Sequence, residues 1–122
     1  MAMILISDDS APMRARLLEI LEGAGHELLV GEDGIDAVWL FKHHQPDCAL
    51  LDIDMPLMSG IEAVTKIIAV DPAAKIAMVT GERDESTVLH ALTAGAMDYI
   101  GKPFEHDRVL ATVEKLLGKA AA

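Results

Sequence analysis

Short apolar runs recur along the chain at intervals that suit one strand and one helix each. Continuous apolarity over a strand length is typical of strands that helices cover on both faces, as in a parallel sheet. The pattern therefore predicts a buried parallel sheet built from these five runs: Met3 to Ile6, Leu28 to Val30, Cys48 to Leu51, Ile76 to Val79 and Met97 to Ile100.

The stretches between the strands have helical spacing and carry signals for helix ends. Ser10 is a candidate cap for the first helix, and a second helix is predicted over 35–44, before Pro46. Ser59 and Glu62 have the spacing of a capping box at the start of the third helix. The last two helices are expected to end at glycines, which favour the left-handed backbone of helix ends: Gly95 and Gly118.

The order of elements is a strand followed by a helix, five times over. Parallel strands joined by single helices have right-handed crossovers, which place helices on both faces of the sheet. The sequence thus predicts an α/β fold with an open, doubly wound, five-stranded parallel sheet. A length of 122 residues suits one domain, expected to occupy residues 1–122.

Composition and charge narrow the range of partners. The chain holds 20 acidic and 10 basic residues, a formal net charge of -10, which repels nucleic acid and anionic lipid. No apolar stretch approaches the roughly 20 residues that span a bilayer. We therefore expect a cytoplasmic protein without direct nucleic-acid or membrane binding. The single cysteine, Cys48, lies in an apolar run and is expected to be buried.

Polar side chains gather where the predicted strands end. The first strand is followed by Asp8 and Asp9, the third by Asp52, the fourth by Thr80, and the fifth runs into Lys102. In open α/β sheets the ligand site lies beyond the carboxyl ends of the strands. Three carboxylates, a hydroxyl and an ammonium are therefore expected to meet at one edge of the sheet.

Such a group of acids needs a counter-charge. Two like charges about 4 Å apart repel by roughly 4 kcal/mol at an effective dielectric constant near 20. A divalent cation such as Mg²⁺ or Mn²⁺ offsets this repulsion, and Lys102 is suited to bind a phosphoryl oxygen. A carboxylate in such a site can attack phosphorus, so Asp52 is the candidate phosphoacceptor and Thr80 a candidate hydrogen-bond donor to the phosphoryl group.

Four motifs in this order give the chain a family resemblance. Asp8-Asp9, the segment LLDIDMPLMSG at 50–60, Thr80-Gly81 and the segment YIGKPF at 99–104 resemble the motif set of CheY-like response regulator receiver domains. The resemblance covers nearly the whole chain. It implies a flavodoxin-like fold with strand order 2-1-3-4-5 and a phosphorylation-dependent signalling protein, not an enzyme, that assists phosphorylation and dephosphorylation at its own aspartate.

The resemblance also assigns roles to single residues. It implies that Asp9 and Asp52 bind the metal through their side chains, Asp54 through its backbone carbonyl and Asp8 mainly through water. It implies a cis peptide bond before Pro103 that helps to aim Lys102.

A conformational switch and its partners follow from the same resemblance. Thr80 is implied to move toward the phosphoryl group, and the ring of Tyr99 to turn from an outward to an inward position. The expected phosphodonor is a sensor histidine kinase or a histidine phosphotransfer protein. A downstream protein is expected to bind the face made by the fourth helix, fifth strand and fifth helix, with the chain a monomer or a phosphorylation-dependent dimer.

Two acidic residues depart from the commonest pattern of the family. Asp54 lies two positions after the acceptor and Glu82 two positions after Thr80. We hypothesise that their side chains tune the lifetime of the aspartyl phosphate and repel anionic small-molecule donors.

Alternatives remain open at this point. Asp8 and Asp9 suit a helix start, and Asp52-Ile53-Asp54 also resembles the nucleophile motif of haloacid-dehalogenase-type phosphatases. A receiver fold used only as a docking module, without phosphorylation, is a further possibility. Trp39 and the methionines are expected to fill the core and gaps in helix packing, and the five histidines are expected at the surface.

Overall fold

The computed structural model describes residues 2–81 and 84–118. Strands and helices alternate along the chain: β1 (Met3–Ser7), α1 (Ala11–Gly23), β2 (Glu27–Gly31), α2 (Gly34–His44), β3 (Cys48–Leu51), α3 (Gly60–Val70), β4 (Ile76–Thr80), α4 (Glu85–Ala94), β5 (Asp98–Gly101) and α5 (His106–Leu116). Among these described elements, no helix is both long and apolar enough to cross a membrane.

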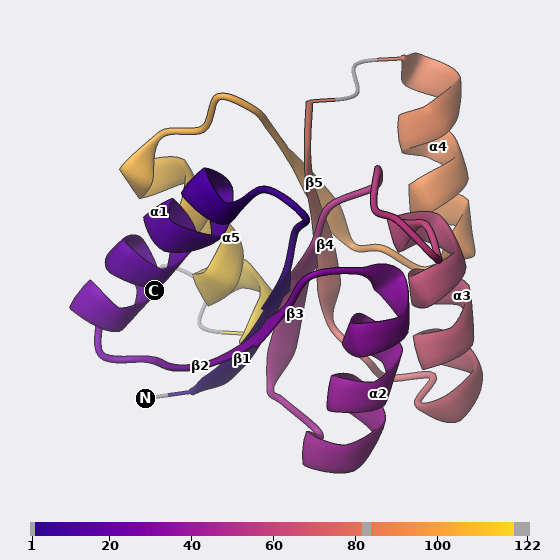
Figure 1. Ribbon diagram of the computed structural model, residues 1–122, viewed down its shortest axis with the longest axis horizontal. Helices are drawn as coiled ribbons and strands as arrows, with labels where there is room; N and C mark the ends of the chain where they lie inside the picture. The colour runs from indigo at the N-terminus through magenta and orange to yellow at the C-terminus, as the bar shows by residue number, and fades with distance from the viewer. Residues whose placement is uncertain (1, 82–83, 119–122) are drawn as a thin grey trace.

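All strand pairs are parallel, in the order β2-β1-β3-β4-β5 (Figure 1). The expected doubly wound fold and strand order are therefore confirmed. The first strand, β1, lies inside the sheet, with β2 on one side of it and β3, β4 and β5 in turn on the other. The direction of winding reverses between β1 and β3, which is where ligand sites form in open α/β sheets.

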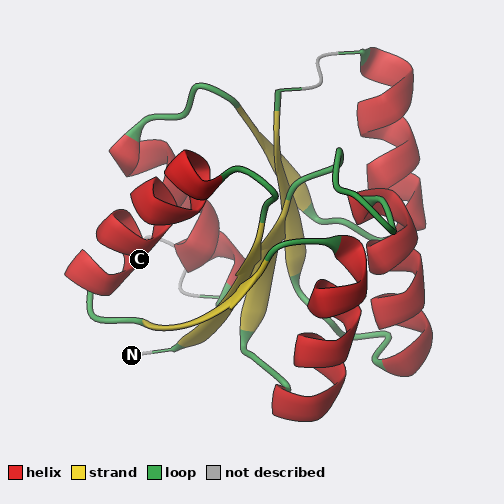
Figure 2. Ribbon diagram, in the orientation of Figure 1, coloured by secondary structure: helices red, strands yellow, loops and turns green. Residues whose placement is uncertain are grey.

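Helices cover both faces of the sheet (Figure 2). One face carries α1 and α5, and the other carries α2, α3 and α4 (Figure 1). Each face has its own cluster of buried apolar side chains. Ile4 and Ile6 of β1 contribute to one cluster, whereas Leu5 between them contributes to the other. A strand that sends alternate side chains into two apolar layers has to be apolar at every position.

Burial on both faces is confirmed for the middle strands but not for the edge strands. All residues of β3 and β4 are buried. In contrast, β2 and β5 hold exposed and half-buried positions, among them Val30, which is 40% exposed. The expectation of full coverage is wrong for these two strands, because an edge strand has a neighbouring strand on one side only.

Three helices begin at side-chain caps. Ser10 accepts a hydrogen bond from the Met13 backbone N–H, and Ser59 accepts one from the Glu62 N–H, as the sequence predicts. The cap of α2 is Asp33, which accepts from Asp36 N at 2.8 Å. These bonds satisfy backbone donors that the first helical turn leaves without partners.

Several side chains expected to fill gaps in packing lie in solvent instead. Trp39 is 53% exposed and Met97 46% exposed, so the packing role expected for them is wrong. The apolar stripe of α4 also faces outward, with Leu89 64% exposed. Only Ala91 of α4 is buried, so this helix lies on the sheet through a small side chain. Cys48 is buried, as expected.

A glycine sets the path of the chain after β3. A Cβ atom on Gly60, the first residue of α3, would collide with the carbonyl oxygen of Asp52 and lie 2.9 Å from Met78 Cε. The backbone of α3 can therefore approach the end of β3 only without a side chain at this position. Gly60 N also donates to Ile53 O at 2.8 Å, which closes the loop between them.

Gly60→Ala is therefore expected to destabilise the protein by about 1–3 kcal/mol, because backbone has to shift to admit the methyl group. Chemical denaturation followed by circular dichroism measures the loss. The matched control is Gly23→Ala, since a Cβ there meets nothing within 4 Å and alanine favours the helix. Equal stabilities of the two variants would show that the loop adapts freely.

Candidate functional site

Three carboxylates meet at the carboxyl ends of the strands. Oxygen atoms of Asp8, Asp9 and Asp52 all lie within 4.8 Å of one another. Asp8 and Asp52 are 1% and 5% exposed, whereas Asp9 is open to solvent. They follow neighbouring parallel strands, and Ser7 of β1 pairs with Leu51 of β3. The sheet register thus brings together acids that lie more than 40 positions apart in the sequence.

Asp8 is held at every oxygen atom. Its Oδ1 accepts from Ser10 N at 2.9 Å, and its Oδ2 lies 2.7 Å from Lys102 Nζ. Its backbone carbonyl accepts from Arg14 Nη1 at 2.8 Å, and Arg14 also lies 3.8 Å from Glu32. Charge-assisted hydrogen bonds of this length fix the carboxylate firmly. Asp8 is therefore placed to orient Lys102 and the loop that carries Asp9.

Lys102 is the cation at the centre of the site. Its Nζ also lies 3.3 Å from Asp52 Oδ2, so one ammonium bridges the two buried carboxylates. Its backbone N donates to Thr80 O at 2.9 Å, and the Lys102–Pro103 peptide bond is cis, as the family resemblance implies. Burial of the ammonium lowers the pKa of Lys102, but the hydrogen bond to Asp8 and the charge of Asp52 outweigh it, and the pKa is raised.

The Asp52 carboxyl lies in an environment that disfavours its charge. Burial is the largest cause, followed by the negative charge of Asp8, and together they raise the pKa of Asp52 to about 6. The Lys102 charge and hydrogen bond, and the Asp54 backbone N–H, lower it only in part. A single lysine does not balance the cluster. The carboxylates carry more negative charge than Lys102 neutralises, so the site can bind one more cation.

The other residues that the sequence predicts for the site differ from one another in burial. Thr80 ends β4 and is fully buried, one strand away from the acceptor. Asp54 is exposed in the loop after β3, and Tyr99 on β5 is 39% exposed. Glu82, the second residue of the tuning hypothesis, lies outside the described residues.

The donor set fits a hard divalent cation. Carboxylate and carbonyl oxygens are the ligands that Mg²⁺ prefers, and it keeps several waters in such sites. Asp9 and Asp52 present carboxylates to the same point, one of them open to solvent where those waters can lie. A third carboxylate, that of Asp8, lies beside them, and Lys102 already neutralises part of its charge. The acidic group therefore fits Mg²⁺ together with an aspartyl phosphate.

Sequence reasoning missed two groups that shape the site. Arg14 and the Ser10 backbone N–H both hold Asp8, and neither takes part in the motif set. Arg14 lies near the start of α1 and bonds the backbone carbonyl of Asp8, an acceptor that the sequence does not mark.

Comparison with known proteins agrees with this geometry. The family model of the response regulator receiver domain matches residues 4–114. The chemotaxis protein CheY of Bacillus subtilis (strain 168) is 44% identical over 115 residues, which cover 93% of this chain and 96% of that protein. Protein CcdB of the same bacterium is 41% identical over 120 residues, which cover 97% and 99% of the two chains.

A solved structure gives the same result. A CheY-like response regulator receiver domain protein of Methanospirillum hungatei JF-1 matches with a TM-score of 0.91 and 30% sequence identity, over 96% of this chain and 94% of that one. The chain belongs to the response regulator receiver domain family. It is a two-component signalling domain, and the fold and motif order predicted from the sequence are those of this family.

Substitution of Asp52 is expected to change the stability of the protein by an amount that depends on pH. A folded-state pKa of about 6 lies above the ordinary value of about 3.9, so the native state binds more protons between these pH values and stability falls as pH rises. In metal-free buffer, Asp52→Asn is expected to be about 1–3 kcal/mol more stable than the parent at pH 7.5, with the difference vanishing near pH 4.

Urea denaturation at several pH values measures this difference. The control is Glu114→Gln, which removes an exposed carboxylate from α5 and should leave the pH dependence unchanged. A difference that grows as the pH falls would mean that the folded protein lowers the pKa of Asp52. Added Mg²⁺ is expected to stabilise the parent more than Asp52→Asn, since it binds the ionised carboxylate.

Proposed function

We propose that this chain is a phosphorylation-dependent switch that accepts a phosphoryl group on Asp52 from a phospho-histidine donor, with Mg²⁺ bound by the acidic group. The observation that carries the proposal is the position of the Asp52 carboxylate, which lies within 4.8 Å of the Asp8 and Asp9 oxygens and 3.3 Å from Lys102 Nζ. Residues 1–122 act as one receiver domain. Its cytoplasmic location stays a prediction.

The residues of the chain divide the work of phosphoryl transfer. An Asp52 carboxylate oxygen attacks phosphorus and forms the new P–O bond, while the phosphohistidine P–N bond breaks and the electron pair leaves with the imidazole nitrogen. Lys102, freed in part from Asp52 as this carboxylate reacts, donates to a phosphoryl oxygen, and the Thr80 hydroxyl donates to another. Bound Mg²⁺ supplies charge neutralisation for the transferring phosphoryl group.

The placement of the acids supports Asp9 and Asp52 as side-chain metal ligands. Asp8 is already bonded at both carboxylate oxygens, which supports a role through water. Asp54 contributes its backbone carbonyl. Mn²⁺ has the same preference for oxygen ligands and is expected to replace Mg²⁺.

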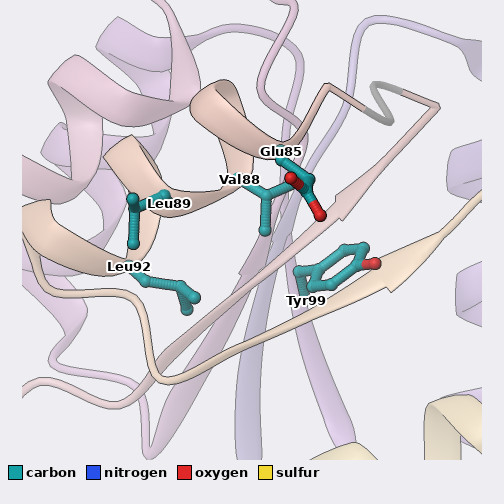
Figure 3. A pocket seen from close by; sticks show the side chains of 5 residues that line it. All are labelled: Glu85, Val88, Leu89, Leu92 and Tyr99. Carbon is teal, nitrogen blue, oxygen red and sulfur yellow. The ribbon is translucent and has the colours of Figure 1, made fainter.

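The signal is proposed to leave through the face made by α4, β5 and α5. A cavity of about 310 Å³ lies between α4 and Tyr99, lined by Glu85, Val88, Leu89 and Leu92. Figure 3 shows these side chains on the α4 side of the cavity and the Tyr99 ring on the β5 side. When Thr80 moves toward a phosphoryl group, space opens beside β4 for the ring to turn inward. A partner that binds the exposed apolar stripe of α4 then contacts a surface of altered shape.

The partners follow from the same site. The phosphodonor is a sensor histidine kinase or a histidine phosphotransfer protein. The downstream partner is a protein that binds the α4–β5–α5 face. Several relatives, including that of Thermotoga maritima at 41% identity, are chemotaxis proteins. A role in chemotaxis, in which a separate protein binds the α4–β5–α5 face, suits the present chain.

Phosphorylation of the purified protein tests the acceptor and the metal together. Incubation with Mg²⁺ and phosphoramidate or acetyl phosphate is expected to add one phosphoryl group, seen by intact mass. Asp52→Asn is expected to lose the addition completely, and Asp9→Asn to slow it by at least about 100-fold, because metal coordination is lost. Excess EDTA should have the same effect on the parent.

The outcome separates the alternatives. No addition from either donor or from any phosphohistidine protein, together with no Mg²⁺ binding by calorimetry, would favour a docking module without phosphorylation. Catalytic turnover of a phosphomonoester by the protein would favour the phosphatase. Addition that persists in Asp52→Asn would place the acceptor elsewhere and overturn the proposal.

The acidic side chain of Asp54 is proposed to regulate the phosphate on Asp52. It is exposed in the loop directly after the acceptor, where it repels anionic donors and lies near the path of hydrolytic water. Asp54→Asn is expected to speed phosphorylation by acetyl phosphate about 3- to 10-fold, since one repulsive charge is removed at short range. It is also expected to change the rate of dephosphorylation.

Rates of gain and loss of the phosphoryl mass measure both effects. Glu114→Gln is the charge-matched control, because Glu114 is exposed near the C-terminal end of α5, the end opposite to the one that follows β5. The tuning hypothesis predicts that Glu82→Ala changes the rates in the same direction as Asp54→Asn. Unchanged rates of both reactions in Asp54→Asn and Glu82→Ala would show that these two acids do not tune the site.

A further inference from the structure

The outward face of α2 holds large apolar side chains in solvent. The helix buries Gly34, Ala37 and Phe41, whereas Ile35 and Trp39 are 49% and 53% exposed. These two residues lie one turn apart, so they form one stripe on the helix surface. Single exposed apolar residues are ordinary, but a stripe that contains the only tryptophan of the chain is a candidate contact surface.

Aromatic rings extend this stripe toward the end of the helix. The Trp39 ring is stacked on His43, with centroids 4.1 Å apart and planes inclined by 20°. His44 meets the indole edge-on at 6.0 Å, and His43 Nδ1 lies 2.9 Å from Trp39 O. The rings are thus held in fixed positions on the exposed side of the helix. A surface that is already ordered loses little conformational entropy when another molecule covers it.

Charges of opposite sign flank the apolar centre. Asp36 lies in the first turn of α2, and the basic residues Lys42, His43 and His44 lie in the last. The helix dipole by itself favours this arrangement of charge. It gives no reason, however, to expose Ile35 beside Asp36 and Trp39 between the charges.

The sequence of the stripe is symmetric about Trp39. Asp36 and Lys42 lie three positions on either side of it, and Ile35 and His43 lie four positions on either side. An antiparallel pair of such helices, related by a two-fold axis at Trp39, brings Asp36 of each copy level with Lys42 of the other. It also brings each Ile35 level with the opposite His43. A two-fold interface requires such self-complementarity, because the same surface serves both partners.

We propose that this face of α2 binds a second copy of the chain, as an antiparallel pair of α2 helices centred on Trp39. The pairing is independent of phosphorylation at Asp52 and uses neither α4 nor β5. One helix pair buries less than the roughly 1,200–2,000 Å² of stable interfaces, so the dimer is weak. The net charge of -10 on each copy adds long-range repulsion that salt screens over about 10 Å at 0.1 M.

Sedimentation equilibrium from 10 µM to 1 mM, at about 0.15 M salt, tests the proposal on the unphosphorylated protein. The mean mass of the parent is expected to rise toward that of a dimer over this range. Trp39→Ala is expected to weaken association at least about tenfold, the effect of losing one well-packed aromatic contact. Leu89→Ala, which removes a 64% exposed side chain from α4, is the control and should associate like the parent. Circular dichroism confirms that each variant is folded.

A charge exchange identifies the geometry. Asp36→Lys and Lys42→Asp are each expected to be monomeric alone, because like charges then face each other. Mixed in equal amounts they are expected to form a heterodimer, since every facing pair is again of opposite sign. A parent that stays monomeric at 1 mM, or association that survives Trp39→Ala, overturns the proposal. Failure of the mixture to associate overturns the antiparallel arrangement, and none of these outcomes bears on phosphorylation.

Discussion

Lys102 Nζ lies 2.7 Å from Asp8 Oδ2 and 3.3 Å from Asp52 Oδ2, and the rest of the site is arranged around this bridge. Two buried carboxylates at this distance are stable only with a positive charge between them. One ammonium leaves the group of three acids still negative. Burial, and after it the negative charge of Asp8, raise the pKa of Asp52, and a divalent cation or a proton offsets the remaining negative charge. Phosphoryl transfer uses the same imbalance, because the site is already suited to positive groups that a phosphoryl group requires.

The fold supplies the bridge by bringing the ends of four strands to one edge. Close approach of backbone makes this possible, and Gly60 is the clearest case, since any side chain there would displace the Asp52 carbonyl. The loop between these residues also contains Leu57, which has a φ of 68° and is 79% exposed. A leucine in the left-handed region carries backbone strain of the order of 1–3 kcal/mol. The other non-glycine residue with a positive φ in the described part of the chain is Gln45, which ends α2.

Much of this arrangement could be predicted from the sequence, for physical reasons. The buried strands β3 and β4 are apolar except for Thr80 at the end of β4, so their positions were evident to within one residue. The polar residues that follow them marked the site. Exposure was harder to predict, because an apolar residue such as Trp39 or Leu89 carries no mark of which way its helix faces. The hydrogen bond from Arg14 to the Asp8 carbonyl was also out of reach, since a backbone acceptor has no sequence signature.

The Lys102–Asp8 contact joins residues 94 positions apart, from the first strand and the last. A chain synthesised through its first four strands already contains Asp8, Asp9 and Asp52. The growing chain still lacks the lysine, so its acids repel one another and the charge pattern of the finished site does not exist. The charge balance of the site therefore depends on β5, the last strand to be synthesised.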